Sequence, residues 1–432
     1  MENLKTDTLG VPEIDNPLFT KNHAEKLKDL TPKETRRILK DITCDATGQI
    51  RDGSAFEKAG ISDKIFFQPQ NTHAAIVTCG GICPGLNDVI RALVLSLYHW
   101  YGVSKISGIK FGYSGLSANP PANPIELTPQ TVSSIHNLGG TILGSSRGCP
   151  PEEEIVDSLV KNKINILFCV GGDGTLRGAH DISEEVKRRN LPISIVGIPK
   201  TIDNDVSYVY RSFGFQTAVA EAKKAINCAH VEASSAYNGI GVVKLMGRDA
   251  GFIAASASIA SGDVNFCLIP EGKLILRGEY GFLEALKERI LTRKHAVIAV
   301  AEGAGTELIG EANETDASGN KLHKDIGTFL NKEIKQAFKK WNIPASLKYI
   351  DPSYIIRSVP ANSDDSIFCA DLARAAVNAA MAGKTDVLVG FWHGEFTVVP
   401  LQAIRNKKKR ISLSSELWHS VIASTGQPPE WQ

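Results

Sequence analysis

The segment Asn165–Asp205, NILFCVGGDGTLRGAHDISEEVKRRNLPISIVGIPKTIDND, contains two apolar runs that each end in a polar loop. The first run, 166–170, leads into the glycine-rich loop 171–175, and the second, 193–198, leads into the loop 199–205. Between the runs, apolar residues recur at spacings of three and four, as in an amphipathic helix. The segment therefore predicts two parallel strands joined by a helix, with both loops at one edge of a sheet.

The two loops carry groups suited to phosphate chemistry. The first is rich in glycine and carries the carboxylate of Asp173 just before the predicted helix. Backbone N–H groups and the positive end of a helix dipole attract phosphate at such a position. The second loop carries Lys200, Asp203 and Asp205. This edge of the sheet therefore offers a phosphate site, a metal ligand and a candidate base, although either of the last two aspartates could instead cap a helix.

Two other loops are candidates for phosphate binding. The loop 79–85, which includes Gly80 and Gly81, lies between a short apolar strand and a helical pattern. The loop 144–148 consists of small residues and Arg147, whose guanidinium could hold a phosphate. Tight packing is the alternative for the first loop and a solvent-exposed turn for the second. The residues alone favour neither reading.

Composition limits the possible functions. The chain has 432 residues, 43% of them hydrophobic, which is enough for two or three domains with cores. A formal net charge of +1 gives no general attraction to nucleic acid or to anionic membranes, and no uncharged apolar run is long enough to span a bilayer. The eight cysteines form no CxxC pair, which indicates reduced thiols. We expect a soluble cytoplasmic protein with no nucleic-acid or membrane partner, in which the basic run Lys407–Arg410 is a solvated linker.

Strands alternate with helices along the chain, which predicts an α/β protein. The strands are too many for one doubly wound sheet, so we expect two doubly wound, Rossmann-like domains with a catalytic cleft between them. Residues 1–70 are expected to form an N-terminal extension with a short helix from Thr31 on. Residues 71–210, completed by part of 360–432, would form the first domain, and residues 211–360 the second.

Four local patterns concern the second domain. Residues 246–251 are expected to open a helix with Arg248 at its start, where a cation is unfavourable unless it shares an anion with the helix. Glu302 closes an apolar strand at its carboxyl end, where ligands bind in open α/β sheets. Residues 311–324 are predicted to be a polar loop, and residues 351–357 a turn into an exposed loop.

Several motifs together resemble a known family. Gly-Gly-Asp-Gly-Thr at 171–175 also occurs by itself in NAD kinases and diacylglycerol kinases. Combined with Pro-Lys-Thr-Ile-Asp-Asn-Asp at 199–205 and Lys-Leu-Met-Gly-Arg at 244–248, it resembles the 6-phosphofructokinases, over about residues 74–400. The extended N-terminus and Tyr-Ile-Ile-Arg at 354–357 are similar to the longer plant, protist and spirochaete branch.

The resemblance implies an allosteric glycolytic kinase, a homodimer or homotetramer, that phosphorylates the 1-hydroxyl of D-fructose 6-phosphate with MgATP. The first domain would bind ATP and Mg²⁺, and the second would bind the sugar phosphate. The implied nucleotide contacts come from Gly80, Gly81, Arg147, Gly148, Gly172, Asp173, Gly174 and Thr175, with Asp173 serving Mg²⁺. The implied sugar-phosphate contacts come from Thr201, Asp203, Met246, Gly247, Arg248, Glu302, Tyr354, Arg357 and, as an additional phosphate contact, Lys348. Asp203 would accept the proton of the hydroxyl, with Thr201 and Lys200 as the other catalytic residues.

The identity of the phosphoryl donor depends on two positions. Lys200 is similar to the pyrophosphate-using branch of the family, whereas those enzymes carry an aspartate where this chain has Gly174. A carboxylate there would repel an α-phosphate, and glycine leaves room for a whole nucleotide. Gly174 therefore predicts ATP as the donor, with pyrophosphate as the alternative.

Two other functions are weighed against this one. NAD and lipid kinases with a Gly-Gly-Asp-Gly-Thr motif are disfavoured because they lack the loop 199–205. A non-catalytic sensor of sugar phosphates is disfavoured because Asp173 and Asp203 are both intact. The short enzymes of the family place an arginine from a neighbouring subunit about where this chain has Gly239, and Lys244 or Lys348 is expected to take over its contact with phosphate.

Overall fold

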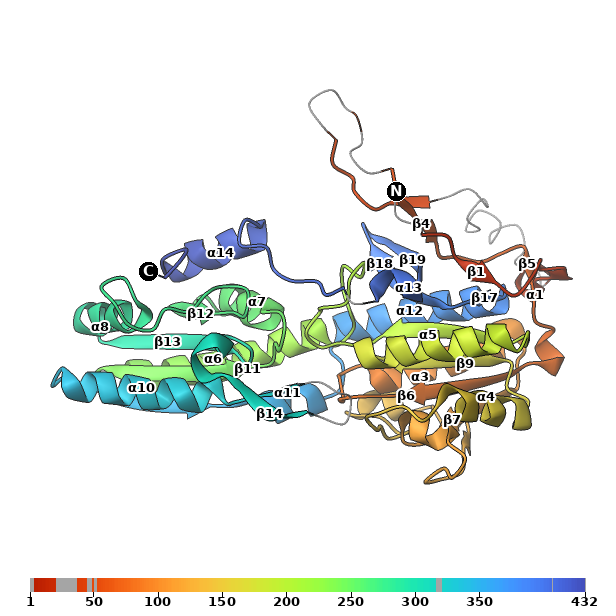
Figure 1. Cartoon of the computed structure of the whole chain (residues 1–432), viewed down its shortest axis with the longest axis horizontal. Helices are drawn as coiled ribbons and strands as arrows, with labels where there is room; N and C mark the ends of the chain where they lie inside the picture. Colours follow the sequence, from red (N-terminus) through yellow and green to blue (C-terminus); the bar gives the residue numbers. More distant parts are fainter. Residues whose placement is uncertain are drawn as a thin grey trace. The chain divides into compact units, whose positions relative to one another are not determined.

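The structure is a computed structural model that describes residues 4–20, 37–44, 49, 53–315, 321–405 and 407–431. The chain forms two compact units, whose segments can be followed by colour in Figure 1. Unit 1 comprises Met1–Thr201, Val206–Gly214 and Val359–Lys407, and unit 2 comprises Ile202–Asp205, Phe215–Ser358 and Lys408–Gln432. The helix expected from Thr31 on lies outside the described residues.

Unit 1 is built on a nine-stranded mixed sheet with the order β3-β4-β19-β18-β10-β9-β6-β7-β8. The five strands from β18 to β7 are parallel, and the outer strands pair antiparallel. Every residue of β6, β9 and β10 is buried, as expected for parallel strands with helices on both faces. The strands are β3 (Arg37–Leu39), β4 (Ala55–Lys58), β6 (His73–Thr78), β7 (Lys105–Ile109), β8 (Ile125–Glu126), β9 (Ile166–Gly171), β10 (Ser194–Pro199), β18 (Val387–Trp392) and β19 (Glu395–Pro400).

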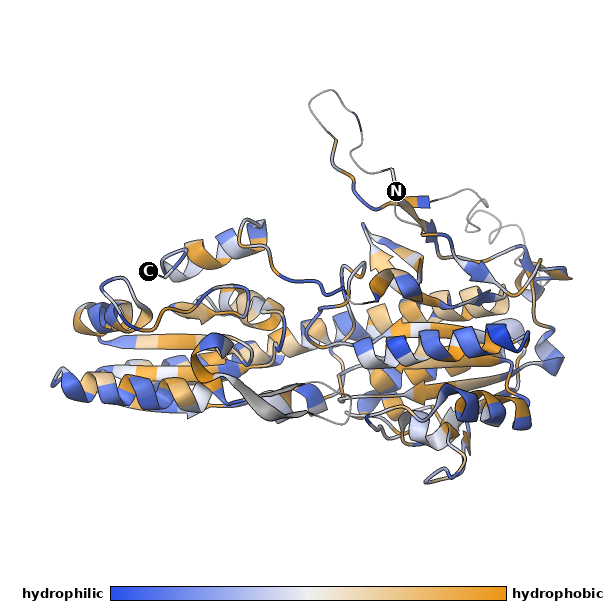
Figure 2. Cartoon of the chain, viewed as in Figure 1, coloured by the Kyte–Doolittle hydropathy of each residue, from blue (hydrophilic) through white to orange (hydrophobic). Residues whose placement is uncertain are grey.

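Helices pack on this sheet with their apolar sides. The helix α5 (Asp173–Arg188) packs on β9 and β10 beside α4 (Glu152–Lys161), and α12 (Ser363–Met381) packs on β10 and β18 beside α3 (Leu86–Leu95). Figure 2 shows apolar residues along the strands, whereas apolar and hydrophilic residues alternate along α5. The apolar positions of α5 join one cluster with alternate residues of the strands, which fixes the helix against the sheet.

The remaining elements of unit 1 are short. The strands β1 (Asp7–Thr8) and β17 (Lys384–Thr385) form one antiparallel pair, and β2 (Ile14–Asp15) and β5 (Lys64–Ile65) form another. The short helices are α1 (Pro17–Thr20), α13 (Leu401–Ile404), a π-helical segment (Ser96–Tyr101) and three 3₁₀ turns (Pro69–Asn71, Gly112–Leu116 and Ile135–Asn137).

Unit 2 is built on a four-stranded parallel sheet with the order β12-β13-β11-β16. Apolar residues of the sheet form one cluster with α8 and α10, while α6 and α7 pack on β13 and on each other. The strands are β11 (Gly239–Leu245), β12 (Phe266–Leu268), β13 (His295–Ala301) and β16 (Ser346–Ile350). The helices are α6 (Phe215–Ser235), α7 (Phe252–Ser261), α8 (Phe282–Arg293), α9 (Thr306–Ile309), α10 (Ile326–Lys340), α11 (Ser353–Ser358) and α14 (Glu416–Thr425).

The prediction of an α/β protein with doubly wound, Rossmann-like units is confirmed, but three local predictions in unit 2 are wrong. The expected loop 311–324 contains an antiparallel hairpin of β14 (Glu311–Thr315) and β15 (Lys321–His323). The expected exposed loop after Asp351 is the helix α11, which places Arg357 in its last turn. The helix α7 begins only at Phe252, so Arg248 lies in the loop before it. Among the described helices, none combines the length and the apolar character needed to cross a bilayer.

Candidate active site

Three loops of unit 1 meet at one edge of the sheet because β6, β9 and β10 are parallel and end side by side. Pro199 at the end of β10 pairs with Gly171 of β9, and Thr78 at the end of β6 pairs with Val170. The pairing continues past the strands, since the N–H of Lys200 donates a hydrogen bond to the carbonyl oxygen of Gly171 (2.9 Å). The glycine-rich loop that follows β9 therefore lies between the two other loops.

Lys200 and residues 145–146 hold Gly80 and Gly81 in place. The buried Nζ of Lys200 donates a hydrogen bond to the carbonyl oxygen of Gly81 (2.6 Å). The N–H of Gly80 donates to the carbonyl oxygen of Ser146 (2.9 Å), and its carbonyl oxygen accepts from the hydroxyl of Ser145 (2.5 Å). The exposed Arg147 follows directly in the same loop, with Gly148 in a left-handed conformation (φ 88°). The structure thus brings together the four loop residues that the sequence assigned to the nucleotide.

The end of β9 requires glycine, and the first turn of α5 that follows it has one open position. A side chain on Gly171 would overlap the side chain of Thr175, so only glycine fits there. Gly172 caps the helix, which begins at Asp173. A Cβ atom on Gly174 would meet no atom of the described residues within 4 Å. Because the first N–H groups of a helix have no partner within it, this open turn is suited to an anion.

Asp203 is the centre of a carboxylate cluster in unit 2. Burial raises the pKa of Asp203 well above its ordinary value, and the charges of Asp205, Glu302 and Asp249 raise it further. A backbone hydrogen bond from Arg248 acts in the opposite direction. These effects favour the protonated form of Asp203, so the side chain can act as a general base only where neighbouring cations keep it ionised.

Backbone pairing joins the loop 246–248 to Glu302. The N–H of Glu302 donates a hydrogen bond to the carbonyl oxygen of Leu245 (2.9 Å), and the N–H of Gly303 donates to that of Gly247 (3.1 Å). A Cβ atom on Gly303 would overlap the carbonyl oxygen of Arg248, so this approach requires glycine. Burial raises the pKa of Glu302, and the charges of Lys244, Arg248 and Arg357 oppose that shift. The Met246-Gly247-Arg248 loop, Glu302 and Arg357 therefore share one carboxyl end of the sheet of unit 2.

The basic run at 407–410 is more than the solvated linker that the sequence predicted. Its Lys408 forms an ion pair with Asp249 and lies 3.9 Å from Asp205. The N–H of Lys409 donates a hydrogen bond to the carbonyl oxygen of Asp205 (2.8 Å), and burial lowers the pKa of Lys409 to about 7. The run links unit 1 to unit 2, and its cations offset part of the negative charge around Asp203.

Comparison with known proteins gives the family. Residues 73–380 match the family described as phosphofructokinase. The chain belongs to the phosphofructokinase family.

Several relatives are close to half identical to this family member over the matched residues. It is 47% identical over 436 residues to the ATP-dependent 6-phosphofructokinase of Borreliella burgdorferi, covering 99% of this chain and 98% of that one. It is 49% identical to the ATP-dependent 6-phosphofructokinase 7 of Arabidopsis thaliana (87% and 78% covered) and 48% identical to the ATP-dependent 6-phosphofructokinase of Entamoeba histolytica (86% and 85%). The solved structure of a pyrophosphate-dependent phosphofructokinase from Marinobacter aquaeolei has the same fold, with a TM-score of 0.67 at 18% identity over 83% of this chain and 93% of that chain.

Three further predicted site residues differ in how they relate to these clusters, and only Lys348 lies apart from the cluster of its own unit. Lys348 lies opposite Gly241 on the neighbouring strand, before the carboxyl end of the sheet, and its Nζ is 3.9 Å from Glu232. Tyr354 is 74% exposed and stacks under the guanidinium of Arg357 (4.5 Å). Thr201 is the last residue of its segment in unit 1, where its carbonyl oxygen accepts a hydrogen bond from Ser212 (2.6 Å).

The sequence reading missed the acidic partners of Lys244 at the carboxyl end of β11. Its Nζ lies 2.7 Å from a carboxylate oxygen of Asp351 and 3.4 Å from one of Asp325, and the Tyr349 hydroxyl donates to Asp325 (3.2 Å). Burial alone would raise the pKa of both aspartates, but hydrogen bonds, including those from Lys244, outweigh it and lower both values. A lysine next to the last residue of an otherwise apolar strand was the only signal in the sequence.

Replacing Lys244 is expected to destabilise unit 2 in a pH-dependent way. Because the pKa values of Asp325 and Asp351 are lowered in the folded state, their stabilising contribution is present above about pH 4 and is lost as the pH falls through the folded-state values. We expect Lys244→Met to lower the free energy of unfolding by about 1–2 kcal/mol at pH 7, allowing for partial exposure of both aspartates, and by less at pH 3. Urea denaturation at both pH values measures the difference.

Lys348→Met is the matched control, since this lysine lies on the next strand and is half exposed with a weak partner. It should change the free energy of unfolding by less than about 0.5 kcal/mol. Equal effects of the two substitutions at pH 7 would show that the ion pairs of Lys244 do not stabilise the protein.

Proposed function

We propose that the protein transfers the γ-phosphoryl group of MgATP to the 1-hydroxyl of D-fructose 6-phosphate, giving fructose 1,6-bisphosphate and ADP. Relatives named ATP-dependent 6-phosphofructokinase, 47–49% identical over most of both chains, support this reaction. Unit 1 would bind the donor and unit 2 the acceptor. A cytoplasmic location, allosteric control and a homodimer or homotetramer belong to the same proposal and follow from the family resemblance alone.

The residues of unit 1 fit a magnesium-bound nucleotide. Asp173 begins α5, and Gly81 and Gly174 leave space in which a phosphate chain can approach the backbone. Asp173 would hold Mg²⁺, which neutralises charge on the phosphates when it is bound. Lys200 would lie against the transferred group, and its hydrogen bond to Gly81 supports this assignment because it places Nζ beside the glycine-rich loop 79–85. The remaining nucleotide contacts are assigned to Gly80, Arg147, Gly148, Gly172 and Thr175.

The residues of unit 2 fit a phosphorylated sugar and a base. In this assignment Asp203 accepts the proton of the sugar's 1-hydroxyl while the hydroxyl oxygen attacks the γ-phosphorus. The bond between the γ-phosphorus and the bridging oxygen of ADP breaks in the same transfer. The raised pKa of Asp203 makes its ionised form a stronger base for that proton transfer. Thr201 would contact the same hydroxyl. Met246, Gly247, Arg248, Glu302, Tyr354 and Arg357 would hold the sugar phosphate, with Lys348 as the least supported member because of its place on β16.

One observation carries the choice of ATP over pyrophosphate. The open space at Gly174 lies in the first turn of α5, next to Asp173, where an α-phosphate would follow the metal-bound phosphates. Lys200 favours the second candidate, a pyrophosphate-dependent phosphotransferase, because lysine there is similar to that branch. The lysine can contact a terminal phosphate in either donor, whereas the glycine matters only for a nucleotide, so ATP is the better-supported donor.

Replacing the proposed base should affect turnover and spare binding. We expect Asp203→Asn to lower kcat by at least about 10²-fold and to leave KM for fructose 6-phosphate within a few-fold, because amide and carboxylate are similar in size but only the latter accepts the proton. Steady-state kinetics with MgATP measures both constants. Asp263→Asn, a partly exposed carboxylate of the same unit, is the control. Near-normal turnover of Asp203→Asn would remove Asp203 from the role of base.

A carboxylate at residue 174 should weaken the use of ATP. The charge of Gly174→Asp would lie a few ångströms from the α-phosphate, which is unfavourable by about 1 kcal/mol in water-like surroundings and by several kcal/mol at an effective dielectric constant near 20. We therefore expect KM for ATP to rise at least about fivefold and activity with pyrophosphate to appear or increase.

Gly174→Ala separates charge from bulk, because its Cβ atom meets open space. Its KM for ATP should stay close to the native value. An aspartate variant that uses ATP as well as the alanine variant would show that residue 174 does not select the donor.

A further inference from the structure

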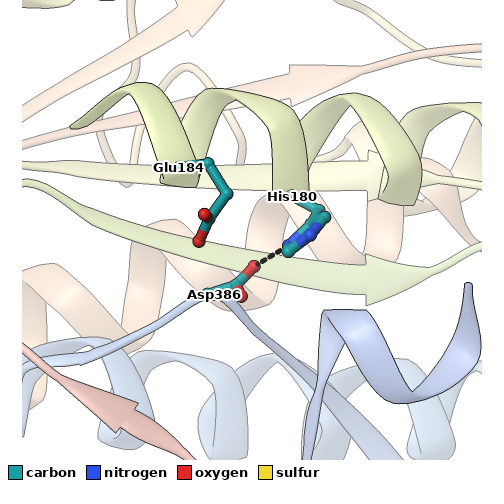
Figure 3. A group of neighbouring side chains, drawn as sticks. All are labelled: His180, Glu184 and Asp386. Carbon is teal, nitrogen blue, oxygen red and sulfur yellow. Dashed lines mark hydrogen bonds and ion pairs between the residues drawn. The ribbon is translucent and has the colours of Figure 1, made fainter. Parts of the chain in front are cut away.

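A second cluster of ionisable side chains lies in unit 1, along α5 from Asp173. His180 and Glu184 are one turn apart on α5, and Asp386 lies between β17 and β18 (Figure 3). The Nδ1 atom of His180 is 2.8 Å from a carboxylate oxygen of Asp386, and Figure 3 shows Glu184 on the same side of the helix. One ring nitrogen and one oxygen from each acid all lie within 4.8 Å of one another. His180 is seven residues after Asp173, or about 10 Å along the helix, so the cluster is separate from the proposed Mg²⁺ ligand.

The surroundings of this cluster are negatively charged. Burial raises the pKa of Asp386, and the charges of Glu184 and Asp7 raise it further. The hydrogen bond with Asp386 raises the pKa of His180 despite burial, and Glu184 and Asp181 contribute to that shift. Lys187, the cation next along α5, forms an ion pair with Asp7 (3.0 Å). A positive charge at the imidazole, from a proton or from a metal ion, would relieve this excess of carboxylates.

The backbone places Asp386 in an uncommon conformation. Its φ of 53° is in the left-handed region, which costs free energy for a residue other than glycine. The N–H of Leu401 donates a hydrogen bond to its carbonyl oxygen (2.9 Å), which helps to hold that conformation. The buried carboxylate thus faces α5 from a fixed position.

We propose that His180, Glu184 and Asp386 bind a divalent transition-metal ion, for which Zn²⁺ is the best match. One imidazole nitrogen and two carboxylate oxygens suit Zn²⁺, Co²⁺ or Mn²⁺, whereas Mg²⁺ and Ca²⁺ take oxygen ligands. Two ligands on one Zn²⁺ are separated by at most about 4.4 Å at bond lengths of about 2.0–2.2 Å, so the exposed side chain of Glu184 needs only a small movement.

The ion would replace the proton between His180 and Asp386. The bound ion would link the middle of α5 to the turn before β18, and its remaining coordination positions would be filled by water. Since the imidazole must lose its proton, the affinity should fall by about tenfold per pH unit below the pKa of His180.

The test is thermal unfolding of the whole protein after treatment with EDTA, with ZnCl₂ then added to about 100 times the dissociation constant measured by equilibrium dialysis. We expect one Zn²⁺ per chain and a rise of roughly 5 °C in the unfolding midpoint of unit 1. The same amount of MgCl₂ should give no shift by way of this cluster. With CoCl₂, the absorption spectrum should show bands of nitrogen and oxygen ligation and no thiolate charge-transfer band.

Glu184→Gln is the decisive variant, because it keeps the hydrogen bond between His180 and Asp386 and changes an exposed side chain. It should unfold at the native temperature without metal and lose most of the shift with Zn²⁺. Glu152→Gln, an exposed glutamate on α4, should keep the whole shift. An unchanged shift in Glu184→Gln would place the ion elsewhere, for example on exposed cysteines, and no shift in the native protein would leave only a hydrogen-bonded pair. Either result would overturn the proposal.

Discussion

The parallel pairing of β9 with β6 on one side and with β10 on the other is the constraint on which unit 1 depends. Parallel strands need crossover helices, so α5 must follow β9, and its first turn must begin where all three strands end. Gly171 can be nothing larger because Thr175 packs against it, and Gly174 remains open. The phosphate-suited backbone is thus a consequence of strand order, and Lys200 is hydrogen-bonded to it at Gly171 and at Gly81.

Unit 2 is organised around a different constraint, which is the cost of burying carboxylates. The charges of Asp205, Asp249 and Glu302 add to the effect of burial in raising the pKa of Asp203, because a carboxylate charge is unfavourable in a buried site that already holds others. Arg248 and Lys408 supply the compensating charge within the unit. A bound sugar phosphate would enter this balance as one more anion, and Arg248 is the cation of the cluster that is proposed to contact it.

Features that depend on the local spacing of residues could be predicted from the sequence. Features that depend on contacts between residues far apart in the chain could not. The spacing of apolar residues in 165–205 was enough to predict two parallel strands and a helix, and therefore two loops at the same edge of the sheet. The hairpin after Glu311 was missed because its polar composition is that of a loop, while strand pairing satisfies its backbone. The helix α11 was missed because its adjacent isoleucines are poor helix formers. Pro352 favours the start of a helix, and its carbonyl oxygen accepts a hydrogen bond from the N–H of Ile356. The contacts of Lys408 could not be foreseen because nothing in a basic run indicates which acids lie opposite.

We propose that the open start of α5, beside the carboxylate of Asp173, selects a nucleotide as the phosphoryl donor. The most direct measurement is the initial rate of fructose 1,6-bisphosphate formation from fructose 6-phosphate and Mg²⁺, with ATP and with pyrophosphate at equal concentration. The account predicts a much faster reaction with ATP. A faster reaction with pyrophosphate would contradict it.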